Sequence, residues 1–238
     1  MILKAKTNGE YKKIGIIAAM KIEAELLKAH LTGGKSERIS GIEFIAGKWN
    51  NAEVILAVCS EGKVNAALCA EAMILRYAPD AVINTGVAGG LSPTLHVPDV
   101  AVATAVAEHD MDMSPLGYAK GDVLINDRVH SLFEADKEWT MRLLAAAEQA
   151  GSHVEAGVIV SGDAFIADPV KKEELCRRYN AVACEMEGGA IGHTCYVNGV
   201  PFAVLRAISD TADDGTAYQP ARAAAISERI LASVLTAL

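Results

Sequence analysis

The sequence has few aromatic side chains and no long apolar run. Phe, Trp and Tyr together make up 5% of its 238 residues, whereas Ala and Val are abundant. That composition suits a buried parallel sheet covered by helices. No stretch approaches the roughly 20 apolar residues of a membrane span, and residues 1–12 lack the apolar core of a signal peptide. We therefore expect a cytoplasmic protein without a membrane partner.

Positive charge and paired cysteines are also scarce. The formal net charge is -8 and no run of Lys or Arg occurs, which argues against a nucleic-acid partner because phosphate binding needs a basic face. The cysteines are odd in number and none has the C-x-x-C spacing, so they are typical of reduced cytosolic thiols. They are Cys59, Cys69, Cys176, Cys184 and Cys195.

Motifs that would hold a nucleotide cofactor or a metal ion are missing. The glycine-rich segment Gly86–Gly90 does not fit G-x-G-x-x-G, and Gly62-Lys63 lacks the rest of a P-loop. We interpret Gly86–Gly90 as a tight turn after a strand, with close approach of the backbone to a ligand as the alternative. Alternation along a strand would split the potential ligands of His109–Asp112 between two faces, so we expect no metal site.

Apolar β-branched runs alternate with helical patterns along almost the whole chain. With an early hairpin, this alternation predicts an α/β fold that has a mixed central sheet between two helical layers. We see no linker or repeat, so we expect one domain over residues 13–238 after an extension of residues 1–12. Strands are expected at Lys13–Ala19, Glu43–Trp49, Glu53–Val58, Ala81–Thr85, Val100–Glu108, Val154–Ser161 and Phe202–Ile208, and helices at Met20–Leu31, Lys63–Tyr77, Arg128–Ala150, Val170–Tyr179, Gly188–Asn198 and Ala221–Leu238.

Polar side chains and glycines follow several of the predicted strands. They occur at Met20–Glu23, Gly86–Gly90, Ser161–Phe165 and Arg206–Asp210. In open α/β sheets, ligands bind at the carboxyl ends of the strands. Strand-end placement in separate segments is harder to explain by packing than any single motif is, so we predict one binding site built from these segments.

Acidic side chains stand next to apolar runs at three places in the chain. Glu23, Glu187 and Asp210, together with Arg206, fall near the ends of different segments. Isolated buried charges are costly, so they are either structural ion pairs or groups that handle a polar ligand. Carboxylates with separate roles are what glycosyl transfer requires, one as proton donor and another to activate water or steady the cationic sugar. Chemistry alone thus predicts a hydrolase or transferase acting on a glycosidic bond.

Several ordered segments also carry a family pattern. Gly15–Glu23 has the form G-I-I-x-A-M-x-x-E, and it is followed by Asn84–Leu91, Val160–Ile166, Glu185–Glu187 and Arg206–Asp210. In this order the set resembles bacterial 5′-methylthioadenosine/S-adenosylhomocysteine nucleosidases of the purine nucleoside phosphorylase superfamily. The resemblance implies a three-layer α/β/α phosphorylase-like fold, a homodimer, and irreversible hydrolysis of the adenine–ribose bond without a cofactor.

The resemblance also implies roles for individual residues. Asp210 is expected to be the general acid at N7 of adenine. Glu23 is expected to position and deprotonate the attacking water, with Arg206 nearby. Glu187 and Met186 would hold the ribose hydroxyls. Protonation of N7 makes adenine a neutral leaving group, and carboxylates near the ribose stabilise its oxocarbenium-like state.

The adenine and tail positions are assigned in the same way. Phe165 would stack on adenine and the backbone of Ile166 would read its edge. Met113 and Leu116 match positions that close the pocket for the 5′ tail from the partner chain. The other residues predicted to bind substrate are Met20, Glu185, Ser209 and Tyr218, the last as an aromatic lid.

Two positions depart from the pattern. Val87 stands where many members have a serine that helps to hold the water, and Glu61 stands where an apolar residue commonly lines the tail pocket. A carboxylate beside a bare methylthio group is unfavourable. Glu61 would therefore face solvent or pair with the ammonium of a homocysteine tail.

Three alternatives remain open beside the nucleosidase. The first is a hydrolase of another 5′-modified adenosine, such as aminodeoxyfutalosine, whose carboxylate Glu61 would repel if it lines the tail pocket. The second is a phosphorylase, although no arginine occurs in Gly15–Met20 or around Val87 to bind phosphate. The third is a nucleoside-binding protein that has lost catalysis, which the joint presence of Glu23, Glu187 and Asp210 disfavours.

Overall fold

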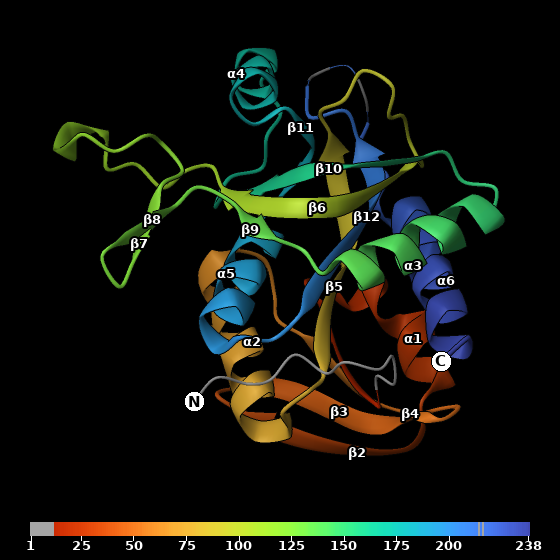
Figure 1. Cartoon of the computed structure of the whole chain (residues 1–238). Helices are drawn as coiled ribbons and strands as arrows, with labels where there is room; N and C mark the ends of the chain where they lie inside the picture. The colour runs from red at the N-terminus through yellow and green to blue at the C-terminus, as the bar shows by residue number, and fades with distance from the viewer. Residues whose placement is uncertain (1–11, 214, 216) are drawn as a thin grey trace.

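A mixed sheet in the order β11-β10-β6-β12-β5-β1-β4-β3-β2 forms the centre of the molecule (Figure 1). The computed structural model describes residues 12–213, 215 and 217–238, so the predicted extension, residues 1–12, lies outside the described residues except for Lys12. The strands of this sheet are β1 (Lys13–Ala18), β2 (Thr32–Ile39), β3 (Ile42–Trp49), β4 (Ala52–Val58), β5 (Ala81–Gly90), β6 (Val100–Glu108), β9 (Phe133–Glu134, paired with β6), β10 (Val154–Ser161), β11 (Ala181–Glu185) and β12 (Phe202–Asp210).

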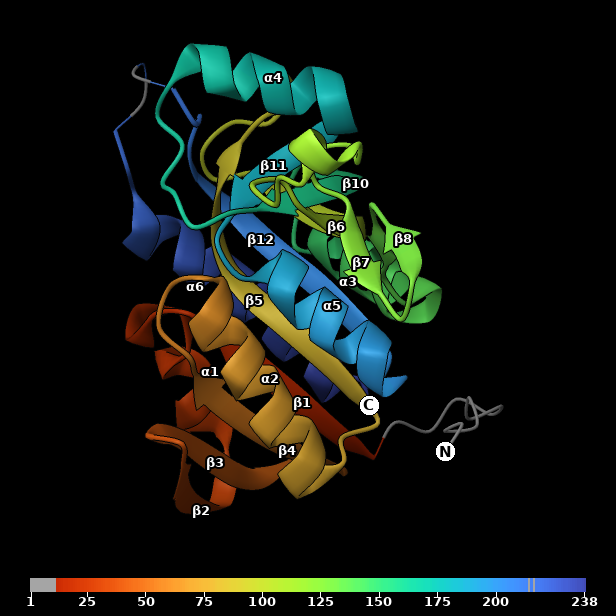
Figure 2. The ribbon, with the colours of Figure 1, turned by 90° about the vertical axis from the view of Figure 1, so that its left-hand side faces the viewer.

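Helices cover both faces of the sheet. On one face α2 (Lys63–Tyr77) packs against α5 (Gly188–Asn198), and on the other α6 (Pro220–Thr236) packs against α1 (Glu25–His30) and α3 (Lys137–Gln149). Figure 2 shows α2 and α5 in front of the sheet with α6 behind it. The three-layer α/β prediction is confirmed. No helix in the described part of the chain is long and apolar enough to cross a membrane.

Two further elements lie at the margins of these layers. Helix α4 (Pro169–Tyr179) packs against β10 and β11. Residues 109–132 project from the sheet beyond the end of β6 and contain the short helix η2 (Ser114–Leu116) and the hairpin of β7 (Val123–Ile125) and β8 (Arg128–His130). We call this segment the arm; it extends to the left in Figure 1.

Strand β11 closes part of the sheet into a ring. It runs parallel to β10 along one edge and pairs antiparallel with the end of β5, where Cys184 faces Gly89. The ring β5-β12-β6-β10-β11 contains two directions of strand, because β6 is antiparallel to β12 and parallel to β10. Closure therefore brings the ends of β5, β11 and β12 to one place, although they do not all run the same way.

Small residues allow β5 to pack closely against its neighbours in this ring of strands. Strand β5 is buried along its whole length, including Gly86–Gly90, so the predicted turn there is wrong and the strand continues to Gly90. Its neighbours β11 and β12 cover Gly86–Gly90, since both pair with this end of β5. The alternative interpretation, close approach of this backbone to a ligand, stays a prediction. What the structure shows is its close approach to protein side chains, since a Cβ atom on Gly86 would lie 2.5 Å from Glu23 Oε1.

Two predicted helices are wrong in their extent. Arg128–Ala150 contains β8 and β9, and α3 begins only after Asp136, whose carboxylate accepts a hydrogen bond from the Trp139 amide at 3.0 Å. Met20–Leu31 is divided into η1 (Lys21–Glu23) and α1, because the Glu23 side chain turns back onto the Ala19 and Met20 amides. The predicted β3–β4 hairpin is confirmed. Strands β2 and β11 were not predicted.

Gly192 tests how tightly α5 lies on the sheet. A Cβ atom built there would lie 2.5 Å from Val106 Cγ2 and 2.8 Å from the Phe202 ring. Alanine favours a helix by about 1 kcal/mol over glycine, but overpacking a core typically costs about 1–3 kcal/mol. We expect Gly192→Ala to lower the free energy of unfolding, as measured by urea denaturation.

The matched control is a Val106→Ala background, which provides space for a methyl group at position 192. In a Val106→Ala background, the alanine at position 192 should cost less, because the deleted methyl groups of Val106 make room for it. An equal cost in both backgrounds would contradict the close packing of α5.

Candidate active site

A cavity of about 240 Å³ opens where β5, β11 and β12 come together. All of the predicted site residues line it except Met113 and Leu116. Its wall consists of Ala19, Met20, Glu23, Glu61, Val87, Ala88, Gly89, Ala164, Phe165, Ile166, Cys184, Glu185, Met186, Glu187, Arg206, Ser209, Asp210 and Tyr218. The structure thus brings together side chains that are up to about two hundred positions apart in the sequence.

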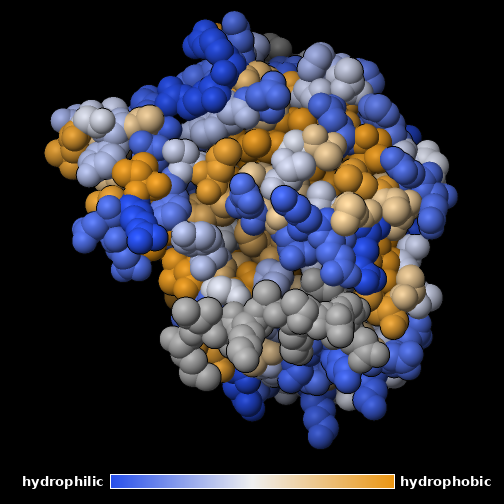
Figure 3. Space-filling model, viewed as in Figure 1, coloured by the Kyte–Doolittle hydropathy of each residue, from blue (hydrophilic) through white to orange (hydrophobic). Residues whose placement is uncertain are grey.

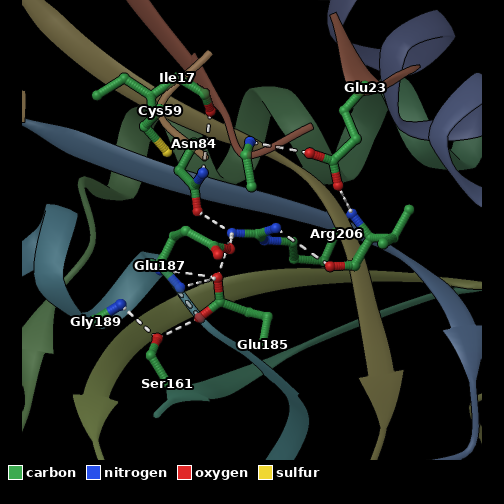
Figure 4. A network of polar contacts seen from close by, with 12 residues as sticks. Ile17, Glu23, Cys59, Asn84, Ser161, Glu185, Glu187, Gly189 and Arg206 are labelled. Carbon is green, nitrogen blue, oxygen red and sulfur yellow. Dashed lines mark hydrogen bonds and ion pairs between the residues drawn. The ribbon is translucent and has the colours of Figure 1, made fainter. Parts of the chain in front are cut away.

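The buried guanidinium of Arg206 holds the floor of the cavity together (Figure 4). Its Nη2 forms an ion pair with Glu185 and lies 3.3 Å from Glu187 Oε2. The same atom donates to Asn84 Oδ1, and Nη1 donates to the Val87 carbonyl oxygen at 3.2 Å. A buried cation is tolerable only when it is paired and hydrogen-bonded, and these contacts meet that requirement.

Glu185 is the main partner of this cation. Besides Arg206, its carboxylate accepts hydrogen bonds from the Ser161 hydroxyl and from the Gly188 amide, the latter at 2.8 Å. The Gly189 amide in turn donates to Ser161 Oγ at 2.6 Å. The carboxylate oxygens of Glu185 already accept hydrogen bonds from the protein. Glu185 therefore fixes the position of Arg206 and offers no free acceptor to a ligand.

Glu187 follows two residues later and also lines the cavity. Its Oε1 accepts a hydrogen bond from the Gly62 amide at 3.0 Å. Burial raises the pKa of Glu187 to about 7, with the negative charge of Glu185 acting in the same direction and Arg206 opposing it. The carboxyl therefore changes its charge near neutral pH.

Glu23 lies at the turn that follows β1. Its carboxylate accepts hydrogen bonds from the amides of Ala19 at 3.0 Å, Met20 at 2.8 Å and Val87 at 2.9 Å. Burial raises the pKa of Glu23, against the opposing effect of Arg206 and these amides. Position 86 has to be glycine, because a Cβ atom there would lie 2.5 Å from Glu23 Oε1.

Asp210 stands at the end of β12. The Ser209 hydroxyl lies 2.9 Å from its Oδ2, and the Ala212 amide donates to Oδ1 at 2.9 Å. Ser209 Oγ also lies 3.2 Å from the Ala88 carbonyl oxygen. These contacts fix the orientation of the carboxyl group at the cavity wall.

The mouth of the cavity is apolar and partly exposed. The rings of Phe165 and Tyr218 meet edge to face with centroids 5.5 Å apart, and the Tyr218 hydroxyl lies 3.8 Å from Met20 Sδ. Phe165 remains 60% exposed, which leaves a flat surface on which a planar ligand can stack. Glu61 is exposed at the same mouth.

Two predicted residues lie elsewhere, and several contributors were missed. Met113 and Leu116 are in the arm, away from the cavity of their own chain, and Leu116 is 74% exposed. Asn84 was not predicted as a site residue, and Ser161 was named only as the start of the segment Ser161–Phe165, although both fix the Arg206–Glu185 pair. A polar residue inside the apolar run Ala81–Thr85 was the available indication for Asn84.

The raised pKa of Glu187 makes stability depend on pH. Below about pH 4.5 its carboxyl is protonated in both the folded and unfolded states, so burial carries no charge penalty. As pH rises from about 4.5 to about 7, the unfolded chain loses this proton while the folded protein keeps it, so unfolding releases a proton. Stability therefore falls across this window, by up to about 3 kcal/mol at 1.4 kcal/mol per pKa unit, and levels off above about pH 7. We expect Glu187→Gln to reduce this fall.

Urea denaturation of the ligand-free protein at several pH values from 4.5 to 8 measures the effect. Glu148→Gln, on the exposed face of α3, is the matched control and should keep the wild-type slope. Identical slopes for wild type and Glu187→Gln would show that Glu187 is ionised throughout this range.

Comparison with known proteins agrees with the geometry. A 5′-methylthioadenosine/S-adenosylhomocysteine nucleosidase of Halalkalibacterium halodurans is 40% identical over 201 residues, covering 84% of this chain and 86% of that protein. The crystal structure of the corresponding Neisseria meningitidis nucleosidase, in complex with methylthio-immucillin-A, has a TM-score of 0.90 at 35% identity and covers 95% of this chain and 100% of that one.

A third similar structure is the futalosine hydrolase of Helicobacter pylori strain 26695. It has a TM-score of 0.88 at 32% identity, and the match covers 96% of this chain and 99% of that one. The family model described as Phosphorylase superfamily matches residues 13–238. The chain therefore belongs to the phosphorylase superfamily and, within it, to the family of 5′-methylthioadenosine/S-adenosylhomocysteine nucleosidases.

Proposed function

We propose that the protein hydrolyses the N-glycosidic bond of 5′-methylthioadenosine and S-adenosylhomocysteine, releasing adenine and the 5-thioribose product. The observation that carries this proposal is a single cavity whose wall presents Glu23, Glu187 and Asp210 from three different segments. The similarity to nucleosidases with these two substrates in their names supports the choice of substrate.

In the proposed reaction, Asp210 donates a proton to N7 of adenine while the C1′–N9 bond breaks. The bonding electrons pass to the purine, which leaves as neutral adenine. A water molecule forms the new bond to C1′ and gives its proton to Glu23. The raised pKa of Glu23 strengthens it as a base, and the amides that bind it fix its direction.

The remaining residues hold the nucleoside. Glu187 and Met186 contact the ribose hydroxyls, and Phe165 stacks on the purine, whose edge meets the backbone of Ile166. Arg206 keeps Glu187 and Glu185 in place and adds positive charge that limits the pKa of Glu187. Val87 contributes its amide to Glu23, which fixes the base without a side-chain hydroxyl at this position.

The charges of the cavity favour water over phosphate as nucleophile. Among the described residues of its wall, Arg206 is the single Lys or Arg, and its guanidinium already engages Glu185 and Glu187. A phosphate dianion would lie close to the carboxylates without a free cation to bind it. The proposed reaction is therefore a hydrolysis and not a phosphorolysis.

A second candidate is a hydrolase of another 5′-modified adenosine. The similarity to futalosine hydrolase favours it, because the match extends over nearly the whole chain. The position of Glu61 at the cavity mouth disfavours a substrate such as aminodeoxyfutalosine, which carries a carboxylate on its tail. The thioadenosine substrates are for this reason the first choice.

Release of adenine in phosphate-free buffer tests the proposal. We expect turnover of both 5′-methylthioadenosine and S-adenosylhomocysteine, with no increase on addition of phosphate. Asp210→Asn should lower kcat at least about a hundredfold, the usual lower range for loss of a general acid, while the circular dichroism spectrum is retained. Phosphate-dependent release would identify a phosphorylase, and adenine binding without turnover would indicate a binding protein.

We also propose that the protein is a homodimer. Exposed apolar side chains occur on α2, on α5 and on the arm, and Figure 3 shows apolar patches on the arm and on the face below it. They are Val64, Leu68, Leu75, Tyr196, Val197, Leu116, Leu124, Val129 and Leu132. An apolar surface of this extent marks a protein contact, and in a dimer Met113 and Leu116 would reach the cavity of the partner.

Light scattering coupled to size-exclusion chromatography tests the dimer. We expect the double substitution Leu68→Glu and Leu75→Glu to shift the protein to the monomer and to lower turnover of the nucleoside, since a monomer would lack the partner's arm. Leu26→Glu, on the helix α1 across the sheet, should leave the mass unchanged. A monomeric wild-type protein would contradict the proposal.

A further inference from the structure

Acidic groups outnumber basic ones on the wall of the cavity. Glu23, Glu185, Glu187 and Asp210 are buried, and each carboxylate accepts at least one hydrogen bond from the protein. Glu61 differs from them in both respects. It is exposed, and within the described part of the chain its carboxylate has neither a hydrogen bond nor an ion pair.

The position of Glu61 is fixed by its neighbours. The next residue, Gly62, donates its amide to Glu187 Oε1 at 3.0 Å, so Glu61 stands beside the carboxyl group that we assign to the ribose. Glu61 lines the same cavity as Met20 and Tyr218. We infer that a substituent on the 5′ side of a ribose held by Glu187 would reach Glu61, because the adjacent Gly62 contacts the Glu187 carboxyl group.

The nearest basic residue in the sequence does not neutralise Glu61. Lys63 directs its Nζ to Glu108 at 3.2 Å and to Asp110 at 2.6 Å. Instead, the charge of Glu61 acts on the cavity, where burial and the negative charges of Glu23, Asp210 and Glu61 together raise the pKa of Tyr218. Glu61 is thus an uncompensated negative charge at the cavity mouth.

We propose that Glu61 determines substrate specificity by favouring 5′-thioadenosines whose tail carries a positively charged nitrogen over those with uncharged or anionic tails. This inference rests on the proposed nucleosidase function. An ammonium group at the mouth would pair with the Glu61 carboxylate and contact the face of the Tyr218 ring. An alkyl tail would instead remove water from the carboxylate, and an anionic tail would be repelled.

Three substrates of similar tail length separate these effects. They are 5′-(3-aminopropylthio)adenosine, 5′-(butylthio)adenosine and 5′-(2-carboxyethylthio)adenosine, with cationic, uncharged and anionic tails. We expect kcat/KM in the wild type to fall in that order. Glu61→Gln should lower the ratio of kcat/KM for the cationic substrate to kcat/KM for the uncharged substrate about two- to fivefold, which is the range of an exposed ion pair.

Charge reversal and added salt provide two independent tests. In Glu61→Lys, kcat/KM should be higher for the substrate with the anionic tail than for the one with the cationic tail. In the wild type, 0.5 M salt, on the order of ten times a low-salt buffer, should reduce the preference for the cationic tail by screening. Glu148→Gln removes the same formal charge on the exposed face of α3 and should leave all ratios at their wild-type values.

The outcomes distinguish this inference from the function on which it rests. If adenine is released from the three substrates with ratios that Glu61→Gln does not change, the specificity role is wrong and the nucleosidase proposal stands. If wild-type protein releases adenine neither from any of the three substrates nor from 5′-methylthioadenosine, the proposed function is wrong. The role of Glu61 is then wrong with it.

Discussion

The ion pair between Arg206 and Glu185 is the contact on which the rest of the site depends. Arg206 lies within β12 and Glu185 ends β11, so the pair joins two strands of the closed ring at the floor of the cavity. Removal of one member would leave the other charge buried without its partner, which typically costs about 3–5 kcal/mol. Asn84, Ser161 and the Gly188 amide provide further hydrogen bonds to the pair.

This pair also sets the chemistry of its neighbours. Glu187 lies close enough to Arg206 to be stabilised as an anion, yet burial and the charge of Glu185 raise its pKa to about 7. Glu23 is held by amides instead, and its pKa is raised by burial. Two carboxyl groups in one cavity thus acquire proton affinities above that of a carboxyl in water, a property that proton transfer at neutral pH requires.

The sequence was most informative where residues act within one segment. The alternating pattern located β1, β3, β4, β6, β10 and α2, and the strand-end rule indicated Glu23, Phe165 and Asp210, all of which line the cavity. It was least informative where contacts join distant segments. Ser161 belongs to the site only because β11 brings Glu185 beside it, and the exposed, largely polar strand β2 has no apolar face to predict it.

Ring closure explains why the segments that follow β10 and β12 meet in one cavity. The strand-end rule predicted this meeting, although β10 and β12 run in opposite directions and in an open sheet Ser161 and Asp210 would lie at different edges. The pairing of β11 with the end of β5 brings both ends to the same cavity. Glycine suits the paired position itself, because a Cβ atom on Gly89 would lie 3.3 Å from Cys184 Sγ and 3.0 Å from Asp210 Oδ1. A side chain on Gly86 would collide with Glu23 and Arg206. The glycines that the sequence predicted to form a turn thus let the strand approach the carboxyl groups of Glu23 and Asp210 closely.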